Sequence, residues 1–170
     1  DGAAHSIEEV TADGFVGNDG ATYSGFASIT NVIEIPKDNT FEDTLKSGTV
    51  AGNYAITQVY GKLTITPSEN ASLKVNGYTG TYDGQPHEVT ASVTDYFEGN
   101  EWTLTYSTDG TTYSAEMPTR TDARTYPVWV KASCGNYEDL VVEVNAEISP
   151  KPVTLTSKSQ SWSYDGAAHS

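Results

Sequence analysis

The sequence predicts an all-β protein made of two small tandem β-sandwich units, Ig-like in type, in an elongated rod; β-grasp-like units are the alternative. Three observations predict this class: composition, alternation and internal repetition. The 170 residues include 11 Tyr and 15 Gly but one Met, which suits short strands and tight turns. Apolar residues alternate with polar ones over several segments, and no segment has an apolar stripe of helical spacing and length.

The chain repeats itself at a fixed interval, which we call the repeat period. Its first hexapeptide, Asp1–Ser6, is identical to its last, Asp165–Ser170. The three histidines are equally spaced, at positions 5, 87 and 169, and the distance between neighbouring histidines defines the period. Self-similarity at a fixed period is typical of repeat architectures, so the chain contains two units and the opening of a third.

Short polar segments that contain proline mark the unit boundaries, at residues 67–70 and 149–152. Proline stiffens such a linker and removes a backbone donor. We therefore assign three segments, which are residues 1–67 as unit one, 68–150 as unit two and 151–170 as the opening strand of a third unit. Unit one lacks its first strand, because the counterpart of residues 71–81 is missing before Asp1.

Alternation places the strands within the units. In unit two we expect strands over 73–75, 87–93, 101–107, 126–134 and 140–148, and in unit one over 6–11, 23–35, 40–45 and 54–66. The strand that begins at Tyr126 should turn Val128 and Val130 inward. Asp122 precedes Tyr126 by four residues, which resembles the tyrosine corner of Ig-like sandwiches. We therefore expect the Tyr126 hydroxyl to bond to backbone a few residues upstream.

Charge and cysteine content exclude several classes of function. With 23 acidic and 9 basic residues, the net charge of −14 argues against binding to nucleic acid or to an anionic membrane surface. No apolar run approaches the roughly 20 residues that a membrane-spanning helix needs. The single cysteine, Cys134, excludes an internal disulfide framework and a cysteine-based zinc site.

No catalytic or metal-binding motif is visible. The chain has no nucleophile elbow, phosphate-binding loop or zinc-binding helix motif. The three histidines belong to three different units, so they cannot supply the ligands of one zinc ion. We expect a non-enzymatic protein with no catalytic residue, no metal and no cofactor. Asx turns explain oxygen-rich loops such as that at Asp19, although calcium and isopeptide cross-links stay open as alternatives.

One aromatic residue breaks the inward pattern. Trp129 should face outward on its strand, as should Lys131 two residues later. An exposed aromatic ring on a sheet can stack on a sugar or anchor a protein partner, so Trp129 and Lys131 form a candidate ligand-binding surface for a host glycan or protein. The alternative is cross-strand packing with a lysine stem or another aromatic ring.

Several short motifs, in their order and spacing, resemble a known type of repeat. In unit two they cover residues 81–87, 106–110, 121–126 and 135–137, and in unit one residues 39–41, 52–54 and 60–67. Together they resemble the YDG/MBG-type β-rich tandem repeats of large bacterial, Gram-positive-type cell-surface adhesin-like proteins. The resemblance implies an extracellular stalk or spacer at the cell wall and no particular ligand. Arg124 departs from it, because the family commonly has Gly there.

The final segment predicts a partner. Val153–Thr156 matches Ala71–Lys74 at an offset of one repeat period, but no unit of its own follows it. An unpaired edge is a template for a strand from another chain. We therefore expect neighbouring repeats of the same protein as partners, joined by strand complementation, in a contact that propagates as an open filament.

Overall fold

The computed structural model describes residues 2–169 and confirms the all-β class. Its regular elements are β1 (Ala21–Ser24), β2 (Lys37–Asp38), β3 (Glu42–Leu45), the 3₁₀ turn η1 (Ala51–Asn53), β4 (Lys62–Leu63), β5 (Ser72–Asn76), β6 (Tyr78–Thr81), β7 (Thr90–Thr94), β8 (Thr103–Ser107), β9 (Thr125–Ser133) and β10 (Leu140–Ser149). Among the described residues, no helix has the length and apolar character to cross a membrane.

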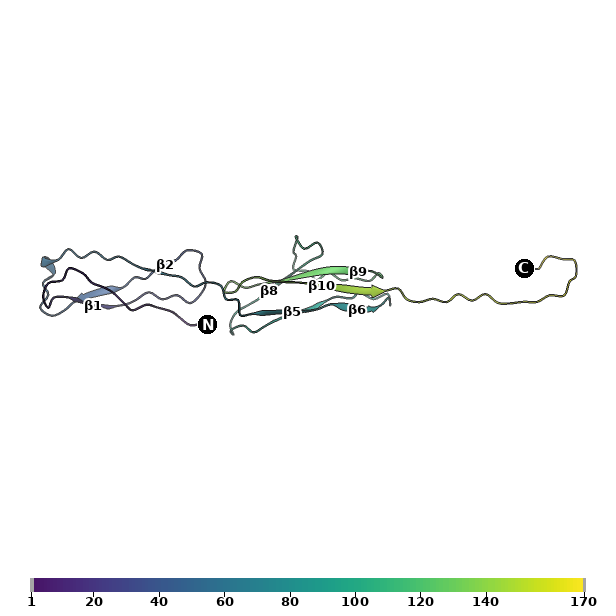
Figure 1. Cartoon of the computed structure of the whole chain (residues 1–170), viewed down its shortest axis with the longest axis horizontal. Coiled ribbons are helices and arrows are strands. Elements are labelled where there is room, and N and C mark those ends of the chain that lie inside the picture. The colour runs from purple at the N-terminus through teal and green to yellow at the C-terminus, as the bar shows by residue number, and fades with distance from the viewer. Residues whose placement is uncertain (1, 170) are drawn as a thin grey trace.

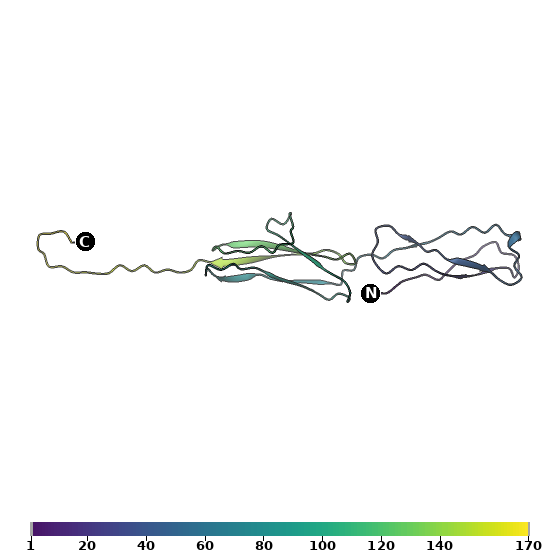
Figure 2. The same cartoon turned by 180° about the vertical axis from the view of Figure 1, so that it is seen from behind.

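The molecule is elongated, as the sequence predicts. Two β-rich bodies lie along one line in Figures 1 and 2. The first contains β1 to β4 and the second contains β5 to β10, and we keep the names unit one and unit two for them. The segment after β10 continues outward from the far end of unit two, so unit two stands between this segment and unit one.

The opening strand of unit two is shared between two sheets. Its first half, β5, pairs antiparallel with β7 in a two-stranded sheet, and its second half, β6, pairs in parallel with β10. The second sheet has the order β6-β10-β9-β8. Gly77 lies between the halves, where a Cβ atom would collide with the backbone oxygen of Asn145. Glycine therefore permits the close backbone approach at the crossing.

Both sheets contribute to one core. Val128 and Val130 of β9 are fully buried, and Val89 and Ala146 are 1% exposed. Partly buried side chains from β5, β7 and β8 pack against these four, among them Leu73. The inward face predicted for the strand after Tyr126 is thus confirmed, while the Ig-like assignment of unit two stays a prediction.

Unit one repeats part of this arrangement with much shorter strands. β1 pairs with β3 and β2 pairs with β4, whereas the long strands expected over 23–35 and 54–66 shrink to these fragments, and residues 6–11 hold none. Of its described hydrophobic side chains, Ile29 and Leu63 are buried. The described strands of unit one form separate two-stranded pairs, so each has fewer neighbours and less core to pack on than a strand of the four-stranded sheet in unit two.

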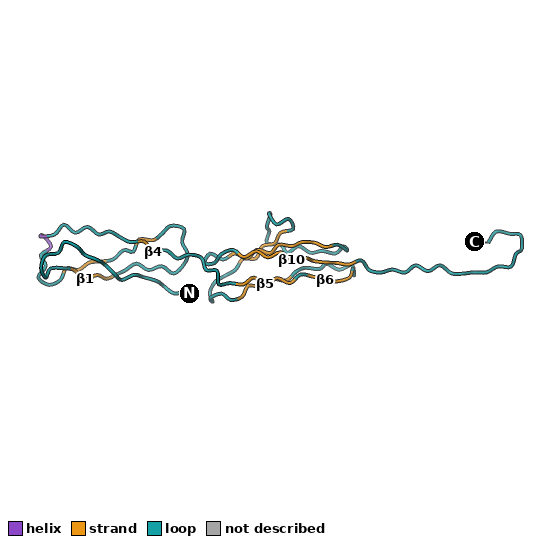
Figure 3. The backbone as a smooth tube through the Cα atoms, in the orientation of Figure 1, coloured by secondary structure: helices purple, strands orange, loops and turns teal. Residues whose placement is uncertain are grey.

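The tail, residues 151–169, corrects another expectation. We predicted the opening strand of a third unit there, but the structure contains no strand in the tail, and every described side chain in it is exposed (Figure 3). A strand is defined by hydrogen bonds to a neighbour. The chain places no neighbouring strand beside the tail, and the segment is extended without being paired.

The core of unit two yields a stability prediction. Val130→Ala should lower the free energy of unfolding of unit two by about 2 kcal/mol, because it removes two fully buried methyl groups. Val141→Ala on neighbouring β10 is the matched control: Val141 is 52% exposed, and its substitution should cost less than about 0.5 kcal/mol. Urea unfolding followed by tryptophan fluorescence measures both, since the three tryptophans lie outside unit one. Equal losses for the two variants would contradict the core assignment.

Candidate functional site

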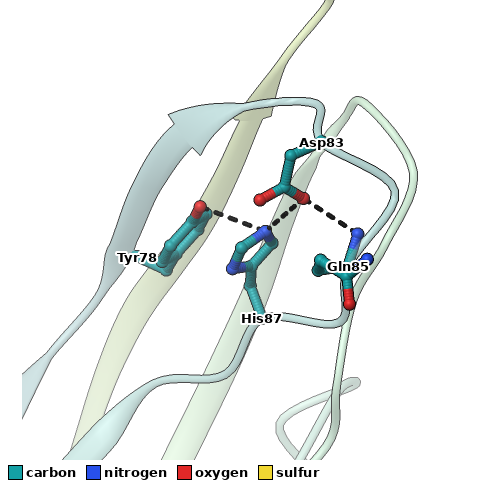
Figure 4. A network of polar contacts seen from close by, with 4 residues as sticks. All are labelled: Tyr78, Asp83, Gln85 and His87. Atoms are coloured by element: carbon teal, nitrogen blue, oxygen red, sulfur yellow. Dashed lines mark hydrogen bonds and ion pairs between the residues drawn. The ribbon is translucent and has the colours of Figure 1, made fainter.

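A polar turn connects β6 to β7 (Figure 4). The Asp83 Oδ1 atom accepts a hydrogen bond from the Gln85 backbone N–H at 2.8 Å and lies 3.0 Å from Nε2 of His87. The Tyr78 hydroxyl lies 3.1 Å from the same nitrogen, and the Tyr78 and His87 rings stack with centroids 4.0 Å apart. Two stacked rings and one carboxylate therefore hold the turn together.

The hydrogen bonds stabilise the ionised form of Asp83. The Gln85 N–H is the largest cause that lowers the pKa of the Asp83 carboxyl below its usual value, and the His87 side chain is the next. A carboxylate that accepts hydrogen bonds in the folded state contributes more stability when it is charged.

This Asp, His and Tyr set is not a catalytic relay. In a relay, the carboxylate orients one ring nitrogen while the other nitrogen takes the proton of the nucleophile. Here Asp83 and Tyr78 both contact Nε2 of His87, so no second group is aligned for transfer (Figure 4). The arrangement fixes a chain reversal.

The tail forms the same turn without a folded unit around it. Asp165 Oδ1 lies 3.0 Å from His169 Nε2 and accepts a hydrogen bond from the Ala167 N–H at 3.0 Å. The Trp162 ring stacks on His169 at an interplanar angle of 14°, as Tyr78 stacks on His87 at 15°. The repeated motif therefore encodes this turn locally.

The junction between the units is the second candidate site. Asn136, in the loop between β9 and β10, reaches across to unit one: its Oδ1 accepts the Val32 N–H at 3.0 Å, and its Nδ2 donates to Asn31 Oδ1 at 3.0 Å. The same Nδ2 lies 3.1 Å from Asn100 Oδ1 within unit two. One amide side chain thus joins two loops of different units.

The linker is also fixed by backbone bonds. The Ser68 N–H donates to the Asn136 carbonyl at 3.0 Å, and the Glu138 N–H donates to the Ser68 carbonyl at 3.0 Å. The prolines at the unit boundary predict a tight linker, but they do not indicate that Asn136 contributes to it. The sequence signal for Asn136 is the Gly-Asn-Tyr motif, which occurs at 52–54 and again at 135–137.

The structure places Trp129 and Lys131 on the outward face of β9, opposite the core. Trp129 is half-buried, and a Cβ atom on Gly110 would lie 3.1 Å from its Cε2 atom, so the indole covers this glycine. Lys131 forms an ion pair with Asp139, with Nζ and Oδ2 2.5 Å apart, and lowers the pKa of that carboxyl. Both side chains have neighbours within unit two, and the candidate ligand-binding surface at Trp129 and Lys131 stays a prediction.

The predicted tyrosine corner is wrong for Tyr126. No hydrogen bond of its hydroxyl is present in the described part of the chain, and its ring lies under Arg120, with the guanidinium carbon 5.0 Å from the ring centroid. The hydroxyl of Tyr137, which is 5% exposed, accepts the Phe97 N–H at 2.8 Å, but this partner belongs to a distant segment and is not a few residues upstream. The spacing of Asp122 and Tyr126 therefore does not produce the expected bond.

Two hollows lie in unit one. Their volumes are about 370 and 240 Å³, and Val10, Thr11, Phe41 and Val59 line both. Neither includes Trp129 or Lys131.

Within the described residues, no group of three His, Cys, Asp or Glu side chains is arranged to hold a metal ion. No family model, curated protein or solved structure matches the chain.

Asp83 gives a prediction with a defined pH dependence. Asp83→Ala should destabilise unit two at pH 7, and its difference from the parent chain should shrink as the pH falls below about 4. The sign follows from the lowered pKa: the stabilisation is present above the pKa of the unfolded state and is lost as the pH falls through the folded value.

Unfolding midpoints in urea, measured between pH 2 and pH 7, test this prediction. Asp165→Ala is the control, because it removes the same turn from the exposed tail and should leave the unfolding of unit two unchanged. A difference between parent and Asp83→Ala that grows on acidification would overturn the assignment.

Asn136 gives a prediction about rigidity. Asn136→Ala should shorten the effective rotational correlation time of each unit in ¹⁵N relaxation measurements, because the two units then reorient more independently. Asn53→Ala, at the matching position of unit one, is the control: no side-chain hydrogen bond of Asn53 is present among the described residues. The ¹⁵N relaxation of both variants is measured at concentrations where the chain is monomeric. Identical relaxation in the two variants would show that Asn136 does not hold the junction.

Proposed function

We propose that this chain is a non-enzymatic spacer module of a tandem array on a bacterial cell surface. The observation that carries the proposal is the junction: the Asn136 side chain and the Ser68 backbone join successive units through short hydrogen bonds. A spacer must hold its two ends at a fixed distance, and the end-to-end distance of an array depends on a fixed angle between its units. A linker held on both sides supplies that constraint, whereas a flexible linker gives a compact coil.

The repeat supports the same function. The Asp-Gly-x-x-His turn occurs at the end of unit two that faces away from unit one, and again in the tail (Figure 1). The same turn thus recurs at an interval of one repeat period, which is expected when identical junctions are made many times. The net charge of −14 favours solubility and repels the anionic envelope that such a stalk would project from.

The resemblance to YDG/MBG-type repeats of adhesin-like proteins supplies the proposed location, which is extracellular and at the cell wall. The polar groups described above support a structural role, since Asp83 and His87 hold a turn and Lys131 and Asp139 pair with each other. In this proposal Trp129 stabilises unit two by covering Gly110.

Concatemers test the spacer directly. Because residues 165–170 repeat residues 1–6, joining Tyr164 of one copy to Asp1 of the next preserves the repeat period. The maximum dimension from small-angle scattering should then increase in direct proportion to the number of copies. A flexible chain of folded beads grows roughly as the square root of that number.

Concatemers that carry Asn136→Ala in each copy are the comparison, and they should fall below the linear relation. Growth of the parent series as a square root would refute the spacer proposal. Linear growth in both series would retain the spacer and assign its stiffness to the Ser68 backbone bonds instead.

A further inference from the structure

Two neighbouring aromatic side chains are exposed in the loop between β7 and β8, residues 95–102, which we call the aromatic loop. Tyr96 is 40% exposed and Phe97 is 44% exposed, with unit one present. The loop follows Thr94, which pairs with Ser72 at the start of β5, so it lies at the end of unit two that faces unit one (Figure 1). These two rings are therefore open to a contact from outside the chain.

The backbone of Phe97 is held on both sides. Its N–H donates to the Tyr137 hydroxyl at 2.8 Å, and its carbonyl accepts a hydrogen bond from Asn100 Nδ2 at 2.9 Å. Tyr137 is 5% exposed, so the first bond anchors the loop to the interior of unit two. A side chain on a fixed backbone loses less freedom on binding, and this preorganisation favours affinity.

The aromatic loop also holds a strained residue. Asp95 has a φ of 63° and is the only non-glycine residue with a positive φ in the described part of the chain. The Thr94 Oγ1 atom donates to Asp95 Oδ2 at 3.0 Å. Strained conformations persist where the surrounding contacts fix them, and they are concentrated at ligand-binding and active sites.

Two further rings connect the exposed pair to unit two. The Trp102 ring meets Tyr96 edge to face with centroids 5.9 Å apart, and it packs on Tyr137 with centroids 5.2 Å apart. Tyr137 in turn bonds to the Phe97 backbone. The exposed rings thus belong to one connected aromatic cluster and rest on the body of unit two.

The charge of the loop selects among ligands. It contains Asp95, Glu98 and Glu101 and no Lys or Arg. All three residues are exposed, and none of their carboxylates forms an ion pair in the described part of the chain. Such a surface repels phosphate, sulfate and carboxylate groups, whereas it accepts hydrogen bonds from uncharged hydroxyl groups.

The exposed pair is smaller than a protein interface. A stable interface covers about 800 Å² on each partner. A whole aromatic side chain offers about 150 to 250 Å², and less than half of Tyr96 and of Phe97 is exposed. A pyranose ring fits the size and the chemistry, because its C–H face packs on an aromatic ring while its hydroxyl groups donate to carboxylates.

We propose that the aromatic loop binds an uncharged glycan. Tyr96 and Phe97 pack on pyranose rings, and Glu98 and Glu101 accept hydrogen bonds from the sugar hydroxyls. The proposal goes beyond the spacer function and does not rest on it, because the whole site lies within unit two and needs no second copy.

An array of neutral and anionic oligosaccharides, probed with the full chain, tests the class of ligand. The chain should be retained on neutral hexopyranose oligosaccharides and not on sialylated, sulfated or uronic-acid oligosaccharides of the same length. A preference for the anionic oligosaccharides, or retention on no neutral oligosaccharide, would overturn the proposal.

Matched substitutions test the site, with the neutral oligosaccharide that gives the strongest array signal as the ligand. Tyr96→Ala and Phe97→Ala should each weaken its binding by about tenfold in calorimetric titration, because each removes a ring from the centre of the contact. Tyr82→Ala is the control: Tyr82 is also 40% exposed but follows β6, at the other end of unit two, and its loss should leave the affinity unchanged. Urea unfolding shows that each variant is folded.

Tyr137→Phe tests the positioning of the loop. It keeps the ring and removes the acceptor of the Phe97 N–H, so the affinity should fall several-fold and ¹⁵N relaxation should show increased motion at residues 96–99. Tyr126→Phe is the control, because it removes a hydroxyl that has no hydrogen bond in the described part of the chain. Unchanged affinity in a variant with a mobile loop would contradict the positioning role of Tyr137.

Two results of the substitutions would overturn the site. One is an equal loss of affinity for Tyr82→Ala and the two loop variants, and the other is a loss for Trp129→Ala while both loop variants bind normally. Neither result affects the growth of concatemers with copy number, so failure here and failure of the spacer proposal are distinguishable.

Discussion

The crossing of the opening strand at Gly77 is the constraint on which unit two depends. A strand must satisfy its backbone groups with a neighbour, and this one uses β7 for its first half and β10 for its second. It therefore fastens two sheets around Val128 and Val130. In the described part of unit one, the regular pairing consists of two separate short pairs, β1 with β3 and β2 with β4.

Local and long-range interactions have different roles in the repeat. The Asp-Gly-x-x-His turn forms both in unit two and in the isolated tail, so its hydrogen bonds need no surrounding fold. The junction is the opposite case, because Asn136 contacts residues more than a hundred positions away. One class of interaction defines where each unit reverses its chain, and the other defines how successive units are oriented.

Sequence reasoning succeeded where the signal was local. Alternation identified the long strands of unit two and the inward face of β9, and periodicity identified the repeated turn. It failed where a partner decides the outcome. Residues 54–66 have strand-like alternation, but their ladder is limited to β4, because a ladder also needs a neighbour that alternation does not specify. The parallel pairing of β6 with β10 joins segments about as far apart as a unit is long. The repeated Gly-Asn-Tyr motif marks Asn136 but does not specify its partners, which lie in the other unit. The spacing of Asp122 and Tyr126 likewise does not specify a hydrogen-bond partner for the Tyr126 hydroxyl.

The parallel pairing of β6 and β10 has a mechanical consequence. The chain enters unit two before β5 and leaves it after β10, at opposite ends of the body (Figure 1). Tension along the rod pulls the first strand one way and the last strand the other, parallel to their common ladder. The hydrogen bonds between them are then loaded in shear, and they must break together instead of opening one after another. A unit with this geometry resists extension most strongly along the long axis of the rod.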